Sequence, residues 1–299
     1  MRLTELVDDY LLVWILGSVA LGLLYPPFGA VTRFSTVILA VMVGSTSLTL
    51  SVARFRAVDL PGLGVALLGH VAMPFLAFGV ARALGLSPEL TAGFVLLGAV
   101  TPELVTPTMT ELAGGDTALA SIVLVVIGVG STAFLPLIVT VLLGGRIPVD
   151  SLAIVEQLLV AVVFPMLLAV WLRTRYGEPI ASREEYYSTV SALMVIVIIG
   201  GVTAENAAII TSNLELVAFV GVGVVALNLT GYLLGWVVSV ASEREGRIAV
   251  TLSVGMRDFA VAAALVVAAG FPPMASLPAV LFGIVEMVSS AALVRWFGS

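Results

Sequence analysis

Long apolar segments follow one another along almost the whole chain, separated by short breaks that contain polar residues, proline or glycine. A helix that crosses a lipid bilayer needs about 20 predominantly apolar residues. Ten segments meet this requirement, at residues 10–28, 32–53, 60–84, 90–113, 117–143, 151–173, 188–209, 213–241, 247–269 and 275–297. The pattern predicts an all-α integral membrane protein with ten transmembrane helices and no separate soluble domain.

The longest polar stretch, RTRYGEPIASREEYY at residues 173–187, divides the ten segments into two groups of five. An excess of arginine marks the cytoplasmic side of a membrane protein. With the N-terminus inside, the inner side collects Arg2, Arg54, Arg56, Arg173, Arg175, Arg183, Arg244, Arg247 and Arg295, and the outer side only Arg33, Arg82 and Arg146. We therefore expect a multi-pass protein of the cell membrane with both termini cytoplasmic and two five-helix repeats of inverted topology.

Inverted repeats are typical of secondary transporters, whose binding sites lie near the bilayer midplane on interrupted helices. Matched polar interruptions occur here in the fourth segment of each half: TPELVTPTMTELAGGD at residues 101–116 and SVGMRDF at residues 253–259. Glu103 and Arg257 stand 154 residues apart, close to the offset between the halves. The sequence predicts that helices four and nine are broken, near residues 102–107 and 253–257.

The composition narrows the class of function. Charged residues make up 11% of the chain and hydrophobic residues 60%, whereas a soluble domain is about 25% charged. All 13 basic residues are arginine and the net charge is −6, which argues against a nucleic-acid partner. One histidine and no cysteine leave little from which to build a catalytic pair or a metal centre. We expect no enzyme activity, no metal and no cofactor.

Four charged residues fall at membrane depth: Arg257 and Asp258 on segment nine, Glu103 on segment four and Glu286 on segment ten. A charge at the bilayer centre costs about 2.5–3.5 kcal/mol on insertion scales, and pairing is the usual relief. We therefore expect the guanidinium of Arg257 within salt-bridge reach of at least one of the three carboxylates. Two interpretations stay open, a structural clamp between the broken helices and a binding site for substrate or coupling ion.

Polar groups without formal charge complete the candidate binding site. Thr106 and Thr108 alternate around Pro107, and Ser253 precedes the second interruption. They offer hydroxyls to a ligand, or bond back to helix carbonyls. The secondary candidates are His70, as a proton relay or a hydrogen-bonded packing residue, and Asn228, as a hydrogen-bond partner between helices.

Several stretches resemble the bile acid:sodium symporter family. They are the fourth-segment region with Gly115–Leu119, the LTGYLLGW stretch of segment eight, the Val-Gly-Met signature at Val254–Met256, and LPAVLFGIVEMVSSAAL in the last segment. The resemblance covers essentially the full chain. It implies a panel domain from the spans at about 10–53 and 151–209, and a core domain from the spans at about 60–143 and 213–297. Broken helices four and nine would cross in the core.

The chain departs from this family at the positions that bind sodium there. Ser253 stands for the acidic residue before Val-Gly-Met, and Arg257 and Asp258 stand for the glutamine and asparagine after it. The polar pair on the fourth span falls at Thr106 and Pro107, and the glutamine on the third at Gly69. Sodium coupling is therefore not carried over. Arg257 is interpreted as a tethered replacement for the cation, with protons as the alternative coupling ion.

The sequence thus predicts a secondary active transporter that moves a small organic anion by alternating access. The alternatives are a proton-coupled or sodium/proton-type ion transporter and a non-transporting membrane receptor. The expected partners are the lipid bilayer and the small solute, and the pattern predicts no particular oligomeric state.

Overall fold

The structure is a computed structural model that describes residues 4, 6–7, 10–50, 59–144 and 151–298. All regular structure in these ranges is helical. Eight helices there are long and apolar enough to cross a membrane, and the shorter helices Leu11–Leu24 and Pro88–Ala99 are also apolar. Arg2, Arg54, Arg56 and Arg146, which contribute to the expected orientation, lie outside the described residues.

The first half of the chain contains α2 (Leu11–Leu24), η1 (Pro26–Phe34), α3 (Ser35–Ser47), α4 (Leu60–Ala83), α5 (Pro88–Ala99), α6 (Thr106–Leu112) and α7 (Thr117–Leu143). The middle contains α8 (Ser151–Leu158), the π-helical turn η3 (Leu159–Val163), α9 (Phe164–Tyr176), α10 (Glu178–Ala181), α11 (Glu184–Glu205) and α12 (Ala207–Ser212). The last part contains α13 (Leu214–Val238), α14 (Arg244–Gly255), α15 (Phe259–Ala268), η4 (Pro273–Ser276) and α16 (Leu277–Gly298).

Polar side chains set the start of several helices. Ser87 Oγ accepts a hydrogen bond from the Leu90 N–H at the start of α5 (3.4 Å), and Asp116 Oδ1 accepts one from the Leu119 N–H at the start of α7 (2.9 Å). Such caps satisfy N–H groups that the first helical turn leaves without an intrahelical partner. Each cap therefore stabilises the helix boundary at which it stands.

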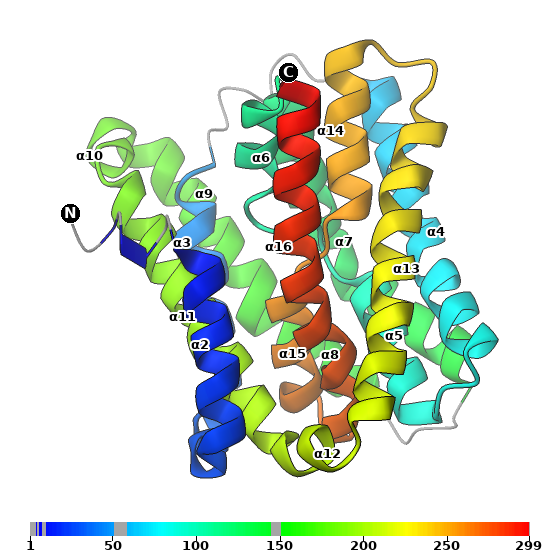
Figure 1. Ribbon diagram of the computed structural model, residues 1–299. Helices are drawn as coiled ribbons and strands as arrows, with labels where there is room; N and C mark the ends of the chain where they lie inside the picture. The colour runs from blue at the N-terminus through cyan, green and yellow to red at the C-terminus, as the bar shows by residue number, and fades with distance from the viewer. Residues whose placement is uncertain (1–3, 5, 8–9, 51–58, 145–150, 299) are drawn as a thin grey trace.

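The helices form two groups that each pack mainly within themselves (Figure 1). In the first group α11 packs against α2, η1 and α3, and α3 packs against α9. In the second group α4 packs against α5 and α13, α13 packs against α14 and α16, and α7 lies against α4, α5 and α14. Helix α15 contacts both groups, since it packs against α16 as well as against α3 and α11.

Two helical paths are interrupted inside the second group. The first path stops at Ala99 in α5 and resumes at Thr106 in α6, and the second stops at Gly255 in α14 and resumes at Phe259 in α15. Pro102 and Pro107 explain the first interruption, because proline disfavours a helical conformation in the residue before it and removes an N–H donor. The second contains no proline; Met256 leaves the helix in an extended conformation (φ −76°, ψ 129°).

Both interruptions lie close to the positions that the sequence predicts, with one shift. The second covers residues 256–258, so that Ser253 lies inside α14 rather than at the break. A break without proline has no residue that marks its first position. Its placement follows from the tertiary contacts described next.

Candidate functional site

The two interruptions meet inside the protein. The backbone N–H of Asp258 donates a hydrogen bond to the carbonyl of Thr101 over 3.0 Å. Val100, Thr101, Met256 and Asp258 are all buried. Irregular backbone at membrane depth is tolerated only beside protein or a cavity, and here each interruption supplies part of the polar surroundings of the other.

Arg257 fills the space between the ends of the interrupted helices. Its side chain is 0% exposed. Its Nη1 donates to the carbonyl of Val100 just beyond α5 (3.2 Å), and its Nη2 donates to the carbonyl of Val254 in the last turn of α14 (2.8 Å). The last carbonyls of a helix have no intrahelical partner and carry the negative end of the helix dipole. The guanidinium therefore satisfies two helix C-termini together.

The third partner of the guanidinium is His70 on α4, whose Nδ1 lies 2.6 Å from Nη1. An arginine only donates, so Nδ1 must be the acceptor, which identifies a neutral ring with its proton on Nε2. The ring also contacts Phe134 of α7, with 5.3 Å between centroids. Of the two roles considered for His70, the contacts match the hydrogen-bonded packing residue.

The prediction that Arg257 forms a salt bridge with Glu103, Asp258 or Glu286 is wrong. Among the described residues, no carboxylate oxygen of Glu103, Asp258 or Glu286 lies within 4.0 Å of its guanidinium. The physical reason is that free helix carbonyls take the place of the carboxylates as acceptors. Glu286 contacts the backbone instead, since its Oε2 accepts from the Arg257 N–H over 3.1 Å.

The other buried carboxylates have different surroundings. Asp258 Oδ1 caps α15 by accepting from the Val261 N–H (2.8 Å). One oxygen of each carboxyl group, namely Glu103 Oε2, Asp258 Oδ2 and Glu286 Oε1, is buried without a hydrogen-bond partner among the described residues. The carboxyl of Glu103 also lies close enough to those of Asp258 and Glu286 to interact with them electrostatically.

Three of the four remaining uncharged candidates, Thr106, Ser253 and Asn228, are buried in the protein, and the fourth, Thr108, lines the cavity described below. Thr106 is buried with Oγ1 3.8 Å from Met256 Sδ. Ser253 is buried on α14, and its hydroxyl has no hydrogen-bond partner among the described residues. Asn228 Oδ1 accepts from Ser289 Oγ (2.7 Å), so it joins α13 to α16, one of the roles expected for it. Thr108 is exposed.

A cavity of about 550 Å³ lies between the two groups of helices. Residues of both interruptions line it: Glu103, Leu104 and Val105 from the first, and Met256 from the second. Glu286, Ser290 and Thr108 line it from α16 and α6, and residues of α3, α9 and α11 close the opposite side. Of the nine candidate residues, Glu103, Thr108 and Glu286 line this cavity, whereas Arg257, Asp258, Ser253, Thr106, His70 and Asn228 do not.

Four cavity residues carry charges that the sequence did not place in the site: Glu111, Arg173, Glu184 and Glu185. Arg173 Nη2 donates to Glu184 Oε1 and forms an ion pair between α9 and α11. Arg173 and two of the glutamates, Glu184 and Glu185, belong to the polar 173–187 stretch, from which we predicted the division of the halves and the orientation but no site residue. From the sequence alone, a charged residue at a helix end that lines a cavity cannot be distinguished from one that faces open solvent.

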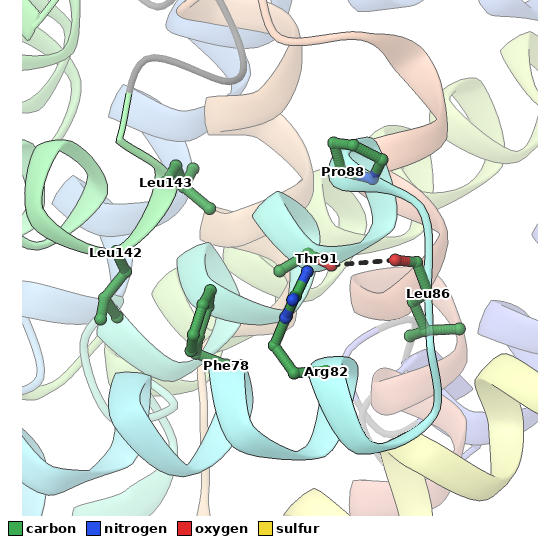
Figure 2. A pocket seen from close by; sticks show the side chains of 7 residues that line it. All are labelled: Phe78, Arg82, Leu86, Pro88, Thr91, Leu142 and Leu143. Carbon is green, nitrogen blue, oxygen red and sulfur yellow. Dashed lines mark hydrogen bonds between the residues drawn. The ribbon is translucent and has the colours of Figure 1, made fainter.

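A second cavity, of about 50 Å³, lies beside the loop between α4 and α5 (Figure 2). Phe78, Arg82, Leu86, Pro88, Thr91, Leu142 and Leu143 line it. Thr91 Oγ1 donates to the Leu86 carbonyl across 3.4 Å, which ties the start of α5 to this loop. Small-molecule sites enclose about 300–1,000 Å³, so this cavity is too small for an organic solute.

Membrane-spanning helices, two of them interrupted, around a cavity with buried carboxylates define a multi-pass membrane transporter. The chain belongs to the sodium bile acid symporter family, whose model matches residues 36–213. This confirms the resemblance seen in the sequence. The family consists of transporters rather than enzymes.

Individual relatives agree with this class. The chain is 25% identical over 292 residues to the uncharacterized sodium-dependent transporter YocS of Bacillus subtilis, covering 95% of this chain and 89% of the relative. It is 24% identical over 231 residues to the probable chloroplastic sodium/metabolite cotransporter BASS1 of Oryza sativa subsp. japonica, covering 76% and 56%. The BASS3 cotransporter of the same plant is 24% identical over 170 residues, covering 57% and 40%. The chain therefore spans little more than half, or less, of these plant proteins.

Proposed function

We propose that the protein is a secondary active transporter that moves a small organic solute across the cell membrane by alternating access. The observation that supports this most directly is the cavity of about 550 Å³ in which the two helix interruptions meet. Its volume falls within the range of about 300–1,000 Å³ that encloses small molecules.

In this proposal the helix group of α2, α3, α9 and α11 belongs to a panel domain, and the group around α4, α5, α7, α13, α14 and α16 to a core domain. The two domains rock against each other, with inverted five-helix repeats as the basis of the two states. The cavity reaches from the 173–187 stretch to the interruptions, since Arg173 and Glu103 both line it. With both termini and this stretch in the cytoplasm, the structure corresponds to an inward-facing state.

The charge of the lining bears on the solute. Among the described residues, five glutamates and one arginine line the cavity; the arginine, Arg173, is paired with Glu184, and Glu111 and Glu185 also have interaction partners. The expectation of an organic anion depended on the positive field of Arg257, which is buried behind the lining with its terminal nitrogens bonded to carbonyls and to His70. Glu103 and Glu286, which each have a carboxyl oxygen without a hydrogen-bond partner among the described residues, favour a solute with a positive or uncharged group at the site. The proposed solute is therefore a small organic cation or zwitterion.

Sodium is not the coupling ion in this proposal. The guanidinium of Arg257 bonds to the carbonyls at the ends of α5 and α14, which would otherwise be oxygen ligands for a cation. Arginine suits this role because it stays charged when buried and offers donors in a planar fork. The relatives are named as sodium-dependent transporters or sodium/metabolite cotransporters, and the proposal does not extend that sodium dependence to this chain.

Alternating access can be tested without knowing the solute, because the chain contains no cysteine. We expect a single thiol introduced by Thr108→Cys, in the cavity, to react with a membrane-impermeant maleimide from the cytoplasmic side and, more slowly, from the outside. Thr110→Cys is the matched control, since Thr110 is fully buried two residues further along α6. A thiol at position 108 that never reacts from the outside contradicts alternating access.

The same thiol tests the charge of the solute. We expect choline, as a cationic probe, to slow labelling at position 108 more than taurocholate, as an anionic probe, at equal concentration. The reason is that Glu103 and Glu286 line the cavity with carboxyl oxygens that have no hydrogen-bond partner among the described residues. Stronger protection by taurocholate would restore the organic anion expected from the sequence.

A further inference from the structure

Glu103 stands out among the buried charges because it is the one that faces the cavity from a helix interruption. It is 8% exposed and lines the cavity next to Leu104 and Val105. Its Oε2 is buried and has no hydrogen-bond partner among the described residues. Arg257 is bonded at both Nη atoms, and Asp258 is held as a helix cap. Glu103 has no comparable structural task.

Glu286 faces the same cavity from α16. It is 1% exposed; one oxygen accepts from the Arg257 backbone N–H, and the other, Oε1, is buried without a partner among the described residues. Two buried carboxyl groups from different helices therefore line one space, each with an oxygen that no described protein group satisfies. Buried polar atoms in native proteins are almost always hydrogen-bonded, so these two indicate a ligand.

The chemistry of the surroundings points to a proton as that ligand. Among the described residues, no group of three or more histidine, aspartate or glutamate side chains has an arrangement that could hold a metal ion. Carboxyl groups inside a membrane protein commonly carry protons. A proton, unlike a metal ion, can be bound by a single carboxyl oxygen and does not need several ligands.

The charged and titratable groups around Glu103 are few. Asp258 in the second interruption, Glu286 on α16 and Tyr232 on α13 lie close enough to Glu103 to interact with it electrostatically; Arg257 is the chain neighbour of Asp258, and His70 on α4 bonds to Arg257. Helix α7, which packs against α6, carries no titratable side chain. Glu111, Arg173, Glu184 and Glu185 also line the cavity. Among the described residues, no arginine lies within ion-pair distance of Glu103.

We propose that Glu103 is the proton-coupling residue of the transporter, and that Glu286 is its neighbour across the cavity. The proposal rests on the alternating-access function above and names its coupling ion. Glu103 takes up a proton at its free carboxylate oxygen when the cavity is open to the side with the lower pH. It releases that proton to the other side after the domains have moved.

The proton changes the cost of this movement. A charged side chain at membrane depth is unfavourable, whereas a protonated carboxyl is neutral. Movement of the core between its two states is therefore easier with Glu103 protonated. Protonation removes the charge that the closed intermediate must otherwise bury, so the movement becomes faster as pH falls, and outside labelling, which requires this movement from the inward-facing state, becomes faster with it.

The Thr108→Cys protein provides the measurement. The readout is the ratio of outside to inside labelling rates, which cancels the pH dependence of the thiol itself. We expect this ratio to rise about tenfold between about pH 8 and about pH 6, a range in which carboxyl groups in apolar sites titrate. Glu103→Gln, which mimics the protonated state, should show a high ratio that no longer depends on pH. Glu103→Asp, which retains the carboxyl, should keep the dependence.

Glu215→Gln is the matched control, because Glu215 is an exposed carboxylate in the first turn of α13 that does not line the cavity. It should leave the pH dependence unchanged. A ratio that does not change with pH, or a Glu103→Gln protein that keeps the wild-type dependence, overturns Glu103 as the proton-coupling residue. Absence of outside labelling at every pH instead overturns alternating access, so the two proposals fail by different results.

Discussion

The two helix interruptions differ in how their polar groups are used. The first, residues 100–105, has Glu103, Leu104 and Val105 on the cavity wall. The second, residues 256–258, reaches the cavity through Met256 alone, and its two charged residues do not line it. Its Arg257 bonds to two helix carbonyls and His70, its Asp258 caps α15, and its backbone N–H groups reach Glu286 and Thr101.

The comparison assigns different tasks to two regions that look equivalent in the sequence. Both interruptions carry charged residues at the same place in their half of the chain. Arg257 and Asp258 of the second form hydrogen bonds within the protein, whereas Glu103 of the first lines the cavity. Arg257 bonds to the carbonyls at the ends of both interrupted helices, and a binding role for it stays a prediction. A site for substrate or ion is supported at the first interruption instead.

The largest expected effect is on stability, at the second interruption. Arg257→Gln removes a charged group with hydrogen bonds to two buried carbonyls, each bond to a charged group contributing about 1.5–3 kcal/mol. We expect the free energy of unfolding to fall by about 3 kcal/mol or more, measured by thermal and denaturant unfolding of the detergent-purified protein.

Arg82→Gln is the control for this change, because Arg82 is an exposed arginine beside the small cavity. It should alter stability by less than about 0.5 kcal/mol. An Arg257→Gln protein as stable as the Arg82→Gln protein would remove the difference between the two interruptions.

A smaller effect is expected at Asp258. Asp258→Ala removes the cap of α15 and should cost about 1 kcal/mol, whereas Asp258→Asn should cost little, because asparagine caps as well as aspartate. The same pair of substitutions at Asp116, the cap of α7, provides the matched comparison. If Asp258→Asn destabilises the protein as much as Asp258→Ala, the carboxylate has a role beyond capping, and the second interruption is more than structural.

The smallest expected effect is that of sodium. The carbonyls at the ends of α5 and α14 are already bonded to Arg257, so replacing potassium by sodium at equal ionic strength should leave thermal stability and labelling at position 108 unchanged. A stabilisation specific to sodium would show that a cation site persists beside the guanidinium. The same comparison in Arg257→Gln asks whether removing the guanidinium restores such a site.

The sequence predicts the two interruptions and the burial of the four charged residues well, but not their contacts. Pro102 and Pro107 mark the first interruption directly, and four charged residues within apolar segments identify the polar centre. The predicted carboxylate partner of the Arg257 guanidinium is wrong because its acceptors include backbone carbonyls. Every residue has such a carbonyl, so the residue type does not reveal which one accepts.

The cavity was harder to predict for a related reason. Arg173 and Glu184 lie eleven residues apart in a polar stretch, and only the packing of α9 against its neighbours turns them toward the cavity. The side chains of Ser253 and Thr106 show the reverse. Their residue types fit a binding site, yet both face the packed interior.

The hydrogen bond between Asp258 and Thr101 has a consequence for the making of the protein. Its two ends, like those of the bond between Arg257 and Val100, are separated by 157 positions along the chain. At about 5–20 residues per second, a ribosome needs about 8–30 s to add that length. During this interval the first interruption is already synthesised while its partners do not yet exist. Membrane insertion of the first half must therefore leave its broken helix near water or the insertion machinery until the second half arrives.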